Sequence, residues 1–171
     1  MRRVTVVGSM GAGKSTFALT LGRILGLEVV HLDLIFLTDE RTEAARMARD
    51  AALSEVLRRP AFILEGGYRW TFARRVARCD TVIWLDIAPH RRLGNLLRRR
   101  WSRAEPIGQH PDPAKARLRG SRLQSPFRMV WDQWQDAALL EQVQASTPDG
   151  VRLVRLQSRA AAQAFLEGFR P

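Results

Sequence analysis

The sharpest chemical signal lies near the N-terminus, in the run GSMGAGKST at residues 8–16. Its spacing, G-x-x-x-x-G-K-[S/T], is that of a phosphate-binding loop. Glycines let the backbone wrap a phosphate with its N–H groups pointing inward, and a following helix adds a favourable dipole. Lys14 is expected to reach the β- and γ-phosphates, and Ser15 to offer its hydroxyl to Mg²⁺. The run predicts an ATP site formed by Gly8, Gly11, Ala12, Gly13, Lys14, Ser15 and Thr16.

A second run, FILEGGYR at residues 62–69, ends an apolar strand with a carboxylate and continues with two glycines and an arginine. It resembles the nucleoside monophosphate kinase segment hydrophobic–hydrophobic–Asp–Gly–Phe–Pro–Arg. The resemblance implies that Glu65 lies near the Mg²⁺ hydration shell and that Arg69 holds the phosphate of an acceptor. Gly67 stands where that family has an aromatic residue, and Tyr68 replaces its proline.

The resemblance extends over most of the chain, from Val4 to about Trp134. With HLD at 31–33, VIWLD at 82–86 and LRRR at 97–100, the set is most similar to the small bacterial DNA topology modulation proteins, which are adenylate-kinase-like P-loop proteins. Adenylate kinases place an arginine shortly after the aspartate of the second strand to grip AMP. Here the nearest arginine is Arg41, and Asn95 stands where an arginine would stack on the ATP base. The resemblance therefore argues against AMP as the acceptor.

Two further side chains are candidates for the acceptor side. Asp33 is expected to follow a short strand at the carboxyl edge of the sheet, where ligands bind in open α/β folds. There it would orient Mg²⁺-bound water or the acceptor hydroxyl, although a turn cap is the alternative. His31 shares the predicted strand face with Asp33 and either lines the acceptor pocket or serves as a core histidine. Asp86 ends the most apolar strand, but in the resemblance that strand leads to the lid rather than to the metal.

The positive charge is concentrated in one segment. The chain has 28 Lys and Arg against 17 Asp and Glu, and residues 91–128 hold eleven of those bases with two acids, which is +9 of the net +11. Such a segment attracts nucleotide phosphates or a nucleic-acid backbone, unless it is only a solvated face. Arg99 and Arg103 share one helix face, so we expect them to contact the transferring phosphate, with Arg122 closing from across the lid.

The elements that must position these residues alternate along the chain. Strands are predicted at residues 3–7, 28–32, 61–64, 81–87 and 151–156, and helices at 15–25, 41–58, 70–78, 89–101, 127–143 and 159–169. This alternation predicts an α/β three-layer sandwich with a mainly parallel five-stranded sheet, of the P-loop nucleoside and nucleotide kinase type. We expect one domain over 1–171, with an arginine-rich lid insert at about 103–125.

Composition bears on the cellular compartment and on membrane association. The single cysteine, Cys79, excludes an intrachain disulfide and a thiolate zinc cluster, and no apolar run approaches the roughly 20 residues of a membrane span. We therefore expect a cytoplasmic protein with no membrane partner. The predicted function is an ATP-dependent phosphotransferase acting on a small molecule. One alternative is a P-loop ATPase whose basic segment contacts nucleic acid, and another is a nucleotide-binding module without turnover.

Overall fold

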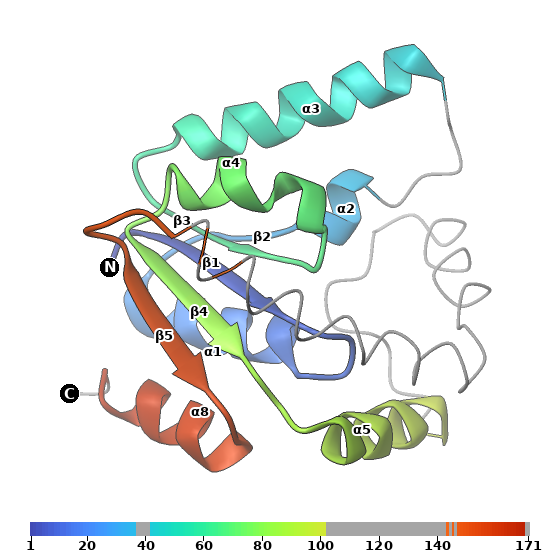
Figure 1. The fold of residues 1–171 in the computed structure, drawn as a ribbon, viewed down its shortest axis with the longest axis vertical. Helices are drawn as coiled ribbons and strands as arrows, with labels where there is room; N and C mark the ends of the chain where they lie inside the picture. The colour runs from blue at the N-terminus through green and yellow to red at the C-terminus, as the bar shows by residue number, and fades with distance from the viewer. Residues whose placement is uncertain (37–41, 102–142, 144, 146, 170–171) are drawn as a thin grey trace.

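The structure, a computed structural model, describes residues 1–36, 42–101, 143, 145 and 147–169, with the backbone alone for 96–101. Its centre is a sheet of five strands, namely β1 (Arg3–Gly8), β2 (Val29–His31), β3 (Phe62–Glu65), β4 (Thr81–Leu85) and β5 (Arg152–Leu156). The strands lie in the order β2-β3-β1-β4-β5, and every neighbouring pair is parallel (Figure 1). All five carboxyl ends therefore point to one edge of the sheet.

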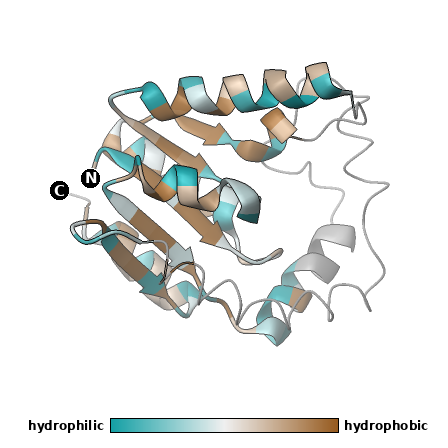
Figure 2. Cartoon of the chain, turned by 45° about the horizontal axis from the view of Figure 1, so that its top comes forward, coloured by the Kyte–Doolittle hydropathy of each residue, from teal (hydrophilic) through white to brown (hydrophobic). Residues whose placement is uncertain are grey.

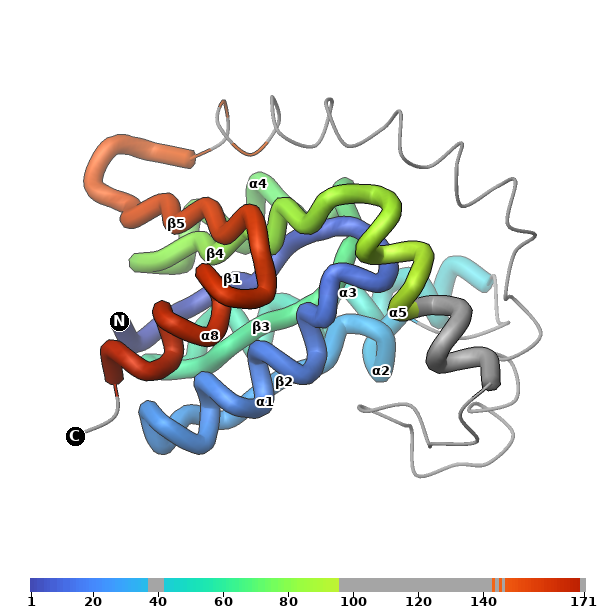
Figure 3. The backbone as a smooth tube through the Cα atoms, turned by 90° about the horizontal axis from the view of Figure 1, so that it is seen from below, coloured from blue at the N-terminus to red at the C-terminus, as the bar shows by residue number. Residues whose placement is uncertain are grey.

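Helices cover both faces of this sheet. They are α1 (Lys14–Leu25), α2 (Leu32–Phe36), α3 (Glu43–Arg58), α4 (Phe72–Val76) with the preceding 3₁₀ turn η1 (Arg69–Thr71), α5 (Pro89–Trp101) and α8 (Arg159–Glu167). Helices α1 and α8 lie on one face, and α3 and α4 on the other (Figures 1 and 3). Helix α5 extends beyond the carboxyl end of β4. This arrangement confirms the predicted three-layer α/β sandwich.

The strands are apolar on both sides because each face packs on helices (Figure 2). Alternate residues of β1 divide between the faces: Val6 packs with Phe17 and Leu21 of α1, whereas Val7 packs with Phe72 and Val76 of α4. The same alternation sends Ile63 of β3 towards α1 and Leu64 to the cluster that includes α3. Side chains two residues apart on one strand thus belong to the same face, which decides where the polar residues at the strand ends point.

Most predicted elements lie within a few residues of the observed ones. Helix α1 ends at Gly26 in the left-handed conformation (φ 64°), and α3 begins after Thr42, whose side chain accepts a hydrogen bond from the Ala45 N–H. The helix predicted at 70–78 is shorter and begins as the 3₁₀ turn. The predicted lid at 103–125 lies outside the described residues, as does nearly all of the helix predicted at 127–143.

One predicted element is wrong at its end. The strand expected at 28–32 stops at His31, and Asp33 lies in the short helix α2. Asp33 therefore does not share a strand face with His31. The reason lies in the spacing of Leu32, Ile35 and Phe36, which is helical rather than alternating. These residues join the apolar cluster that includes α3, with Leu32 fully buried, so packing favours the turn of helix.

Candidate active site

The phosphate-binding loop connects β1 to α1 at the carboxyl edge of the sheet. Gly8 and Gly13 show why this loop needs glycine. Gly8 has φ +146°, and a Cβ there would lie 2.6 Å from the carbonyl oxygen of Leu85. Gly13 caps the N-terminus of α1 in the left-handed conformation (φ 88°). Lys14 starts the helix, and its Nζ donates to the Ser9 carbonyl at 3.0 Å. The loop thus has the strand–turn–helix setting that its spacing predicts.

Helix α5 is tied to this loop by Asn95. The Nδ2 of Asn95 donates a hydrogen bond to the carbonyl oxygen of Gly11 at 2.8 Å. In the family that the chain resembles, the sequence comparison places a base-stacking arginine here. The amide instead fastens the loop to the helix that leads into the basic segment, a role that only the folded chain reveals.

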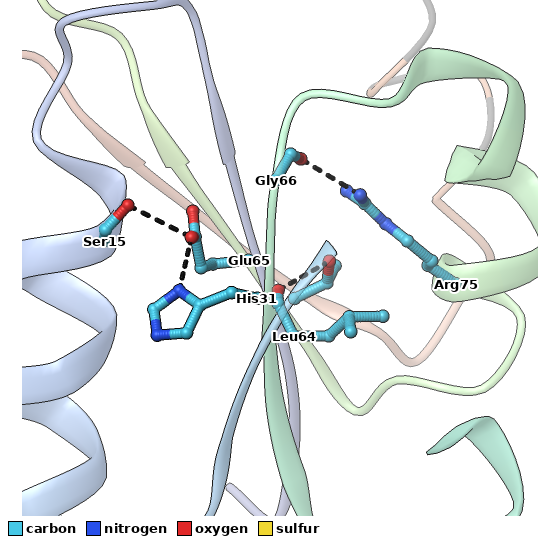
Figure 4. Close-up of polar contacts among 7 residues, drawn as sticks. Ser15, His31, Leu64, Glu65, Gly66 and Arg75 are labelled. Carbon is cyan, nitrogen blue, oxygen red and sulfur yellow. Dashed lines mark hydrogen bonds and ion pairs between the residues drawn. The ribbon is translucent and has the colours of Figure 1, made fainter. Parts of the chain in front are cut away.

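Directly behind the loop, Ser15, His31 and Glu65 form one hydrogen-bonded group on the α1 face (Figure 4). Glu65 follows Ile63 by two residues, so its side chain points towards α1. The sheet register pairs His31 of β2 with Glu65 of β3. The Glu65 Oε1 atom accepts from the Ser15 hydroxyl at 3.0 Å and lies 2.6 Å from His31 Nδ1. Glu65 is 3% exposed and His31 8%, so the contacts are shielded from water.

The charge state of Glu65 follows from its neighbours. Burial alone raises the pKa of the Glu65 carboxyl, but the His31 hydrogen bond, the charges of Lys14 and His31, and the Ser15 hydrogen bond outweigh it, so the net pKa lies below its usual value. An ionised carboxylate only accepts hydrogen bonds, so His31 Nδ1 carries the proton that it shares with Glu65. Because Ser15 donates its one hydroxyl proton to Glu65, both lone pairs of its oxygen remain to coordinate a cation.

These oxygens suit Mg²⁺, which binds proteins through one or two oxygen ligands and completes its shell with water and substrate phosphates. Within the described residues, no three His, Cys, Asp or Glu side chains come together as a metal-binding cluster. Ser15, with Glu65 behind it, is a small oxygen set of the kind that holds Mg²⁺ together with a nucleotide. Asp86, the other acid at a strand end, instead accepts from Arg155 Nε at 2.9 Å and Nη2 at 2.6 Å.

On the opposite face of β3, a small cleft opens beside the loop. It is lined by Val7, Gly8, Gly66, Gly67, Tyr68, Arg69, Phe72 and Arg75. Gly66 has φ +150°, and a Cβ there would lie 2.7 Å from Leu32 Cβ. Tyr68 packs against Phe36 of α2, with ring centroids 4.9 Å apart, and against Trp70 at 5.0 Å. Three segments that are separate in the sequence thus meet around this cleft.

Arg75 is the residue of this cleft that the sequence reasoning missed. It comes from α4, is 1% exposed, and donates through Nη1 to the Gly66 carbonyl at 3.0 Å. A signal was present in the sequence: Arg75 lies three residues after Phe72 and directly before Val76, on the buried face of the helix. An arginine on an apolar helix face is uncommon and marks a position to examine.

The predicted site residues divide into four sets. Lys14, Ser15 and Glu65 come together at the loop, while Arg69 lines the cleft. Asp33 lies in α2, partly exposed. The Arg99 side chain and the whole of Arg103 and Arg122 lie outside what the structure describes.

Comparisons with known proteins identify the fold. No protein-family profile matches the chain, and no curated protein sequence does. Solved structures do match. A shikimate kinase from Acinetobacter baumannii in complex with shikimate has 20% identity and a TM-score of 0.56, covering 98% of this chain and 90% of that one. A shikimate kinase from Bacteroides thetaiotaomicron has 18% identity and a TM-score of 0.58, covering 98% and 95%.

A deoxyadenosine kinase from M. mycoides with bound dATP has 12% identity and a TM-score of 0.57, with 98% of each chain covered. None of the helices among the described residues is long and apolar enough to cross a membrane. The five-stranded parallel sheet, its strand order and these neighbours together show that the chain has the P-loop kinase fold.

Proposed function

We propose that the protein is a Mg²⁺-ATP-dependent phosphotransferase that passes the γ-phosphate to a small acceptor. The observation that carries this proposal is the contact of Ser15 with the buried, ionised Glu65 directly behind the phosphate loop. The solved structures that share the fold are named as kinases of shikimate and of deoxyadenosine, which supports the same reaction class. Within that class we propose a relative of the DNA topology modulation proteins, located in the cytoplasm.

In this proposal the two faces of β3 have different tasks. The N–H groups of the loop and Lys14 bind the nucleotide phosphates, and Ser15, with Glu65 behind it, holds Mg²⁺. When bound, Mg²⁺ supplies charge neutralisation to the phosphates. The acceptor occupies the cleft between Gly8 and the 66–69 loop, at the carboxyl edge where ligands bind in such sheets.

The residues of this chain contribute mainly by position and charge, because phosphoryl transfer needs little covalent help from the protein. Asp33 orients the acceptor hydroxyl, and Arg69 binds an anionic group of the acceptor. Arg99, Arg103 and Arg122 remain the predicted contacts to the transferring phosphate.

The direct test is ADP formation from Mg²⁺-ATP by the purified protein, alone and with sugar acids, shikimate, nucleosides and nucleoside monophosphates. Lys14→Ala is expected to lower the turnover about 100-fold or more, because it removes a cation aimed at the phosphates. Arg23→Ala is the matched control, since it removes one positive charge from an exposed position at the other end of the same helix. It should leave the turnover unchanged.

Two results would count against the proposal. If no acceptor raises ADP release above the acceptor-free rate, there is no small-molecule kinase activity. Steady acceptor-free hydrolysis, together with salt-sensitive binding to DNA or RNA, would instead support the P-loop ATPase alternative, in which the +9 segment at 91–128 contacts nucleic acid.

A further inference from the structure

We propose that Arg75 binds an oxyanion of the acceptor, either a carboxylate or a phosphate monoester, in the cleft between Gly8 and the 66–69 loop. This assignment rests on the proposed function and narrows it, because it places the anionic group of the acceptor at the buried Arg75 as well as at Arg69. It adds to the site a residue that was not predicted from the sequence.

The first support is the hydrogen bonding of the Arg75 side chain. A guanidinium has five N–H donors. Arg75 is 1% exposed, yet the hydrogen bond that it makes among the described residues is the one from Nη1 to the Gly66 carbonyl. Its Nε atom is buried and has no hydrogen-bond partner. Buried donors are almost always paired, and Arg75 lines the cleft, so the unpaired donor favours a ligand as its missing acceptor.

The second support is that Arg75 forms no ion pair among the described residues. Burial lowers the pKa of Arg75 to about 10, which still leaves the side chain protonated at neutral pH. Burial also raises the pKa of Cys79 to about 12, so the thiol beside it is neutral. The charge of Glu65 favours the charged form of Arg75, but the two form no ion pair, and Ser15 and His31 engage that carboxylate on the other face (Figure 4).

A buried, unpaired cation is unfavourable, and an oxyanion supplies both the charge and the acceptors that the guanidinium lacks. The planar fork of arginine matches the two oxygens of a carboxylate or phosphate. A purely structural role would be to hold the Gly66 carbonyl and to pack on the Phe72 ring, whose centroid lies 5.6 Å from Arg75 Cζ. Within the described residues, that role uses one donor of five and leaves the buried charge without an ion pair.

The position of the cleft suits an acceptor. Gly8, where the phosphate loop begins, lines it together with Gly66, Arg69 and Arg75. An anion held there lies next to the loop that binds the nucleotide phosphates. Arg69, which is partly exposed, brings a second positive charge to the same cleft.

The test compares charged and neutral members of matched acceptor pairs. The protein is first saturated with Mg²⁺ and a non-hydrolysable ATP analogue, so that the phosphate loop is filled. Binding is then measured by calorimetry for gluconate against glucitol, for shikimate against its methyl ester, and for AMP against adenosine. We expect the wild type to bind the anionic member of at least one pair about tenfold or more tightly than the neutral one. The carboxylate pairs and the phosphate pair identify which oxyanion is recognised.

Arg75→Met should remove this preference, while affinity for the ATP analogue stays within about twofold. Arg74→Met is the matched control: Arg74 is on the same helix but exposed, and it pairs with Asp50 at 3.2 Å. It should keep the preference. If Arg75→Met does not fold, Arg75→Lys replaces it, because lysine keeps the charge but loses the fork; anion binding should then weaken about fivefold or more with neutral binding unchanged.

Equal binding of charged and neutral members by the wild type would overturn the assignment. An anion preference that survives in Arg75→Met, or in Arg75→Lys where that variant is used, would also overturn it. Anion binding that depends on Arg75 without any ADP formation would leave the assignment standing and refute the phosphotransferase. ADP formation with a neutral acceptor would support the phosphotransferase and overturn the assignment of Arg75.

Discussion

The two faces of the sheet at the end of β3 differ in how completely their buried charged groups are hydrogen-bonded and paired. On the α1 face, the buried Glu65 carboxylate accepts from Ser15 and His31, and Lys14 adds a favourable charge. On the α4 face, the equally buried Arg75 donates one hydrogen bond and has no ion-pair partner in the described residues. The two environments meet at neighbouring residues of the chain: Glu65 belongs to the first, and the carbonyl of Gly66 accepts from Arg75 in the second.

The difference matches what each face must bind under the proposed function. A nucleotide presents the same phosphates at every turnover, so the groups behind the loop gain from being fully fixed beforehand. The acceptor face must leave part of a charge unsatisfied within the protein if a ligand is to satisfy it. A site that leaves a buried group unsatisfied gives up stability for function. Substitutions on the two faces should therefore affect stability in different ways.

The largest expected effect is at Gly66, where the two faces meet. Gly66→Ala places a Cβ 2.7 Å from Leu32 Cβ at a φ of +150°. We expect a loss of about 2–4 kcal/mol in the free energy of unfolding, from backbone strain and overpacking combined. Chemical denaturation measures it. Gly67→Ala is the control, because no atom lies within 4 Å of a Cβ there. Equal stability of the two variants would mean that the chain relaxes freely at this point.

His31→Leu tests whether the α1 face is stabilised by its hydrogen bonds. The substitution removes the donor to Glu65 and leaves that buried carboxylate with fewer partners, at an expected cost of about 2 kcal/mol. His90→Leu, at an exposed position of α5, should change stability by less than about 0.5 kcal/mol. Unfolding curves of both variants provide the comparison. A wild-type-like His31→Leu would show that the histidine contributes packing alone.

The pH dependence of stability gives a further test of the same face. The pKa of the Glu65 carboxyl is lower in the folded protein than its ordinary value of 4.5. The carboxylate therefore stabilises the fold above that value, and the contribution is lost as the pH falls through the lower, folded pKa. Relative to Glu65→Gln, the wild type should be more stable at neutral pH and should lose this advantage as the pH falls below about 4.5. A difference that does not vary with pH would mean that the charge of Glu65 adds no stability.

The sequence predicts residues that belong to a local pattern, and it does not predict contacts that depend on how distant segments pack. The phosphate loop is a local pattern, so its spacing alone predicts Lys14 and Ser15, and the strand–helix alternation predicts the sheet. The pairing of His31 with Glu65 depends on the parallel register of β2 and β3, which no local pattern specifies. Asp33 follows the short strand as predicted, but the strand face that it was expected to share with His31 is wrong, because Leu32, Ile35 and Phe36 pack with helical spacing on the cluster that includes α3.

Arg75 was missed for a different reason. It is one of 28 basic residues in the chain, and it lies in the arginine-rich run ARRVAR at 73–78. Residue type alone therefore does not distinguish it from its basic neighbours. What distinguishes it from Arg74 is burial, which depends on how α4 packs on β1 and β4. Asn95 was likewise assigned by its position in a resemblance, whereas its contact with Gly11 follows from the placement of α5.

A smaller effect is expected for Arg75→Met. Methionine fills a similar volume without a buried charge, so the loss of the hydrogen bond to Gly66 should be largely offset. The free energy of unfolding should stay within about 1 kcal/mol of the wild type or exceed it. Thermal and urea unfolding are both suitable. A loss above about 3 kcal/mol would place Arg75 with Glu65 as a group fixed for stability, and the contrast between the faces would disappear.

The smallest effect is expected at the Arg155–Asp86 pair, which serves as the reference for a cation that is paired and exposed. Arg155 donates twice to Asp86, and its Cζ lies 4.6 Å from the Trp84 ring centroid. Asp86→Asn should lower stability by less than about 1 kcal/mol, because exposed ion pairs contribute little. It should also leave the Mg²⁺ dependence of ATP binding unchanged, since this carboxylate is engaged by Arg155 rather than by Ser15. Titration of nucleotide affinity against Mg²⁺ in Asp86→Asn and in Glu65→Gln separates the two acids: a response in the first and not in the second would move the metal from the β3 strand end to the β4 strand end.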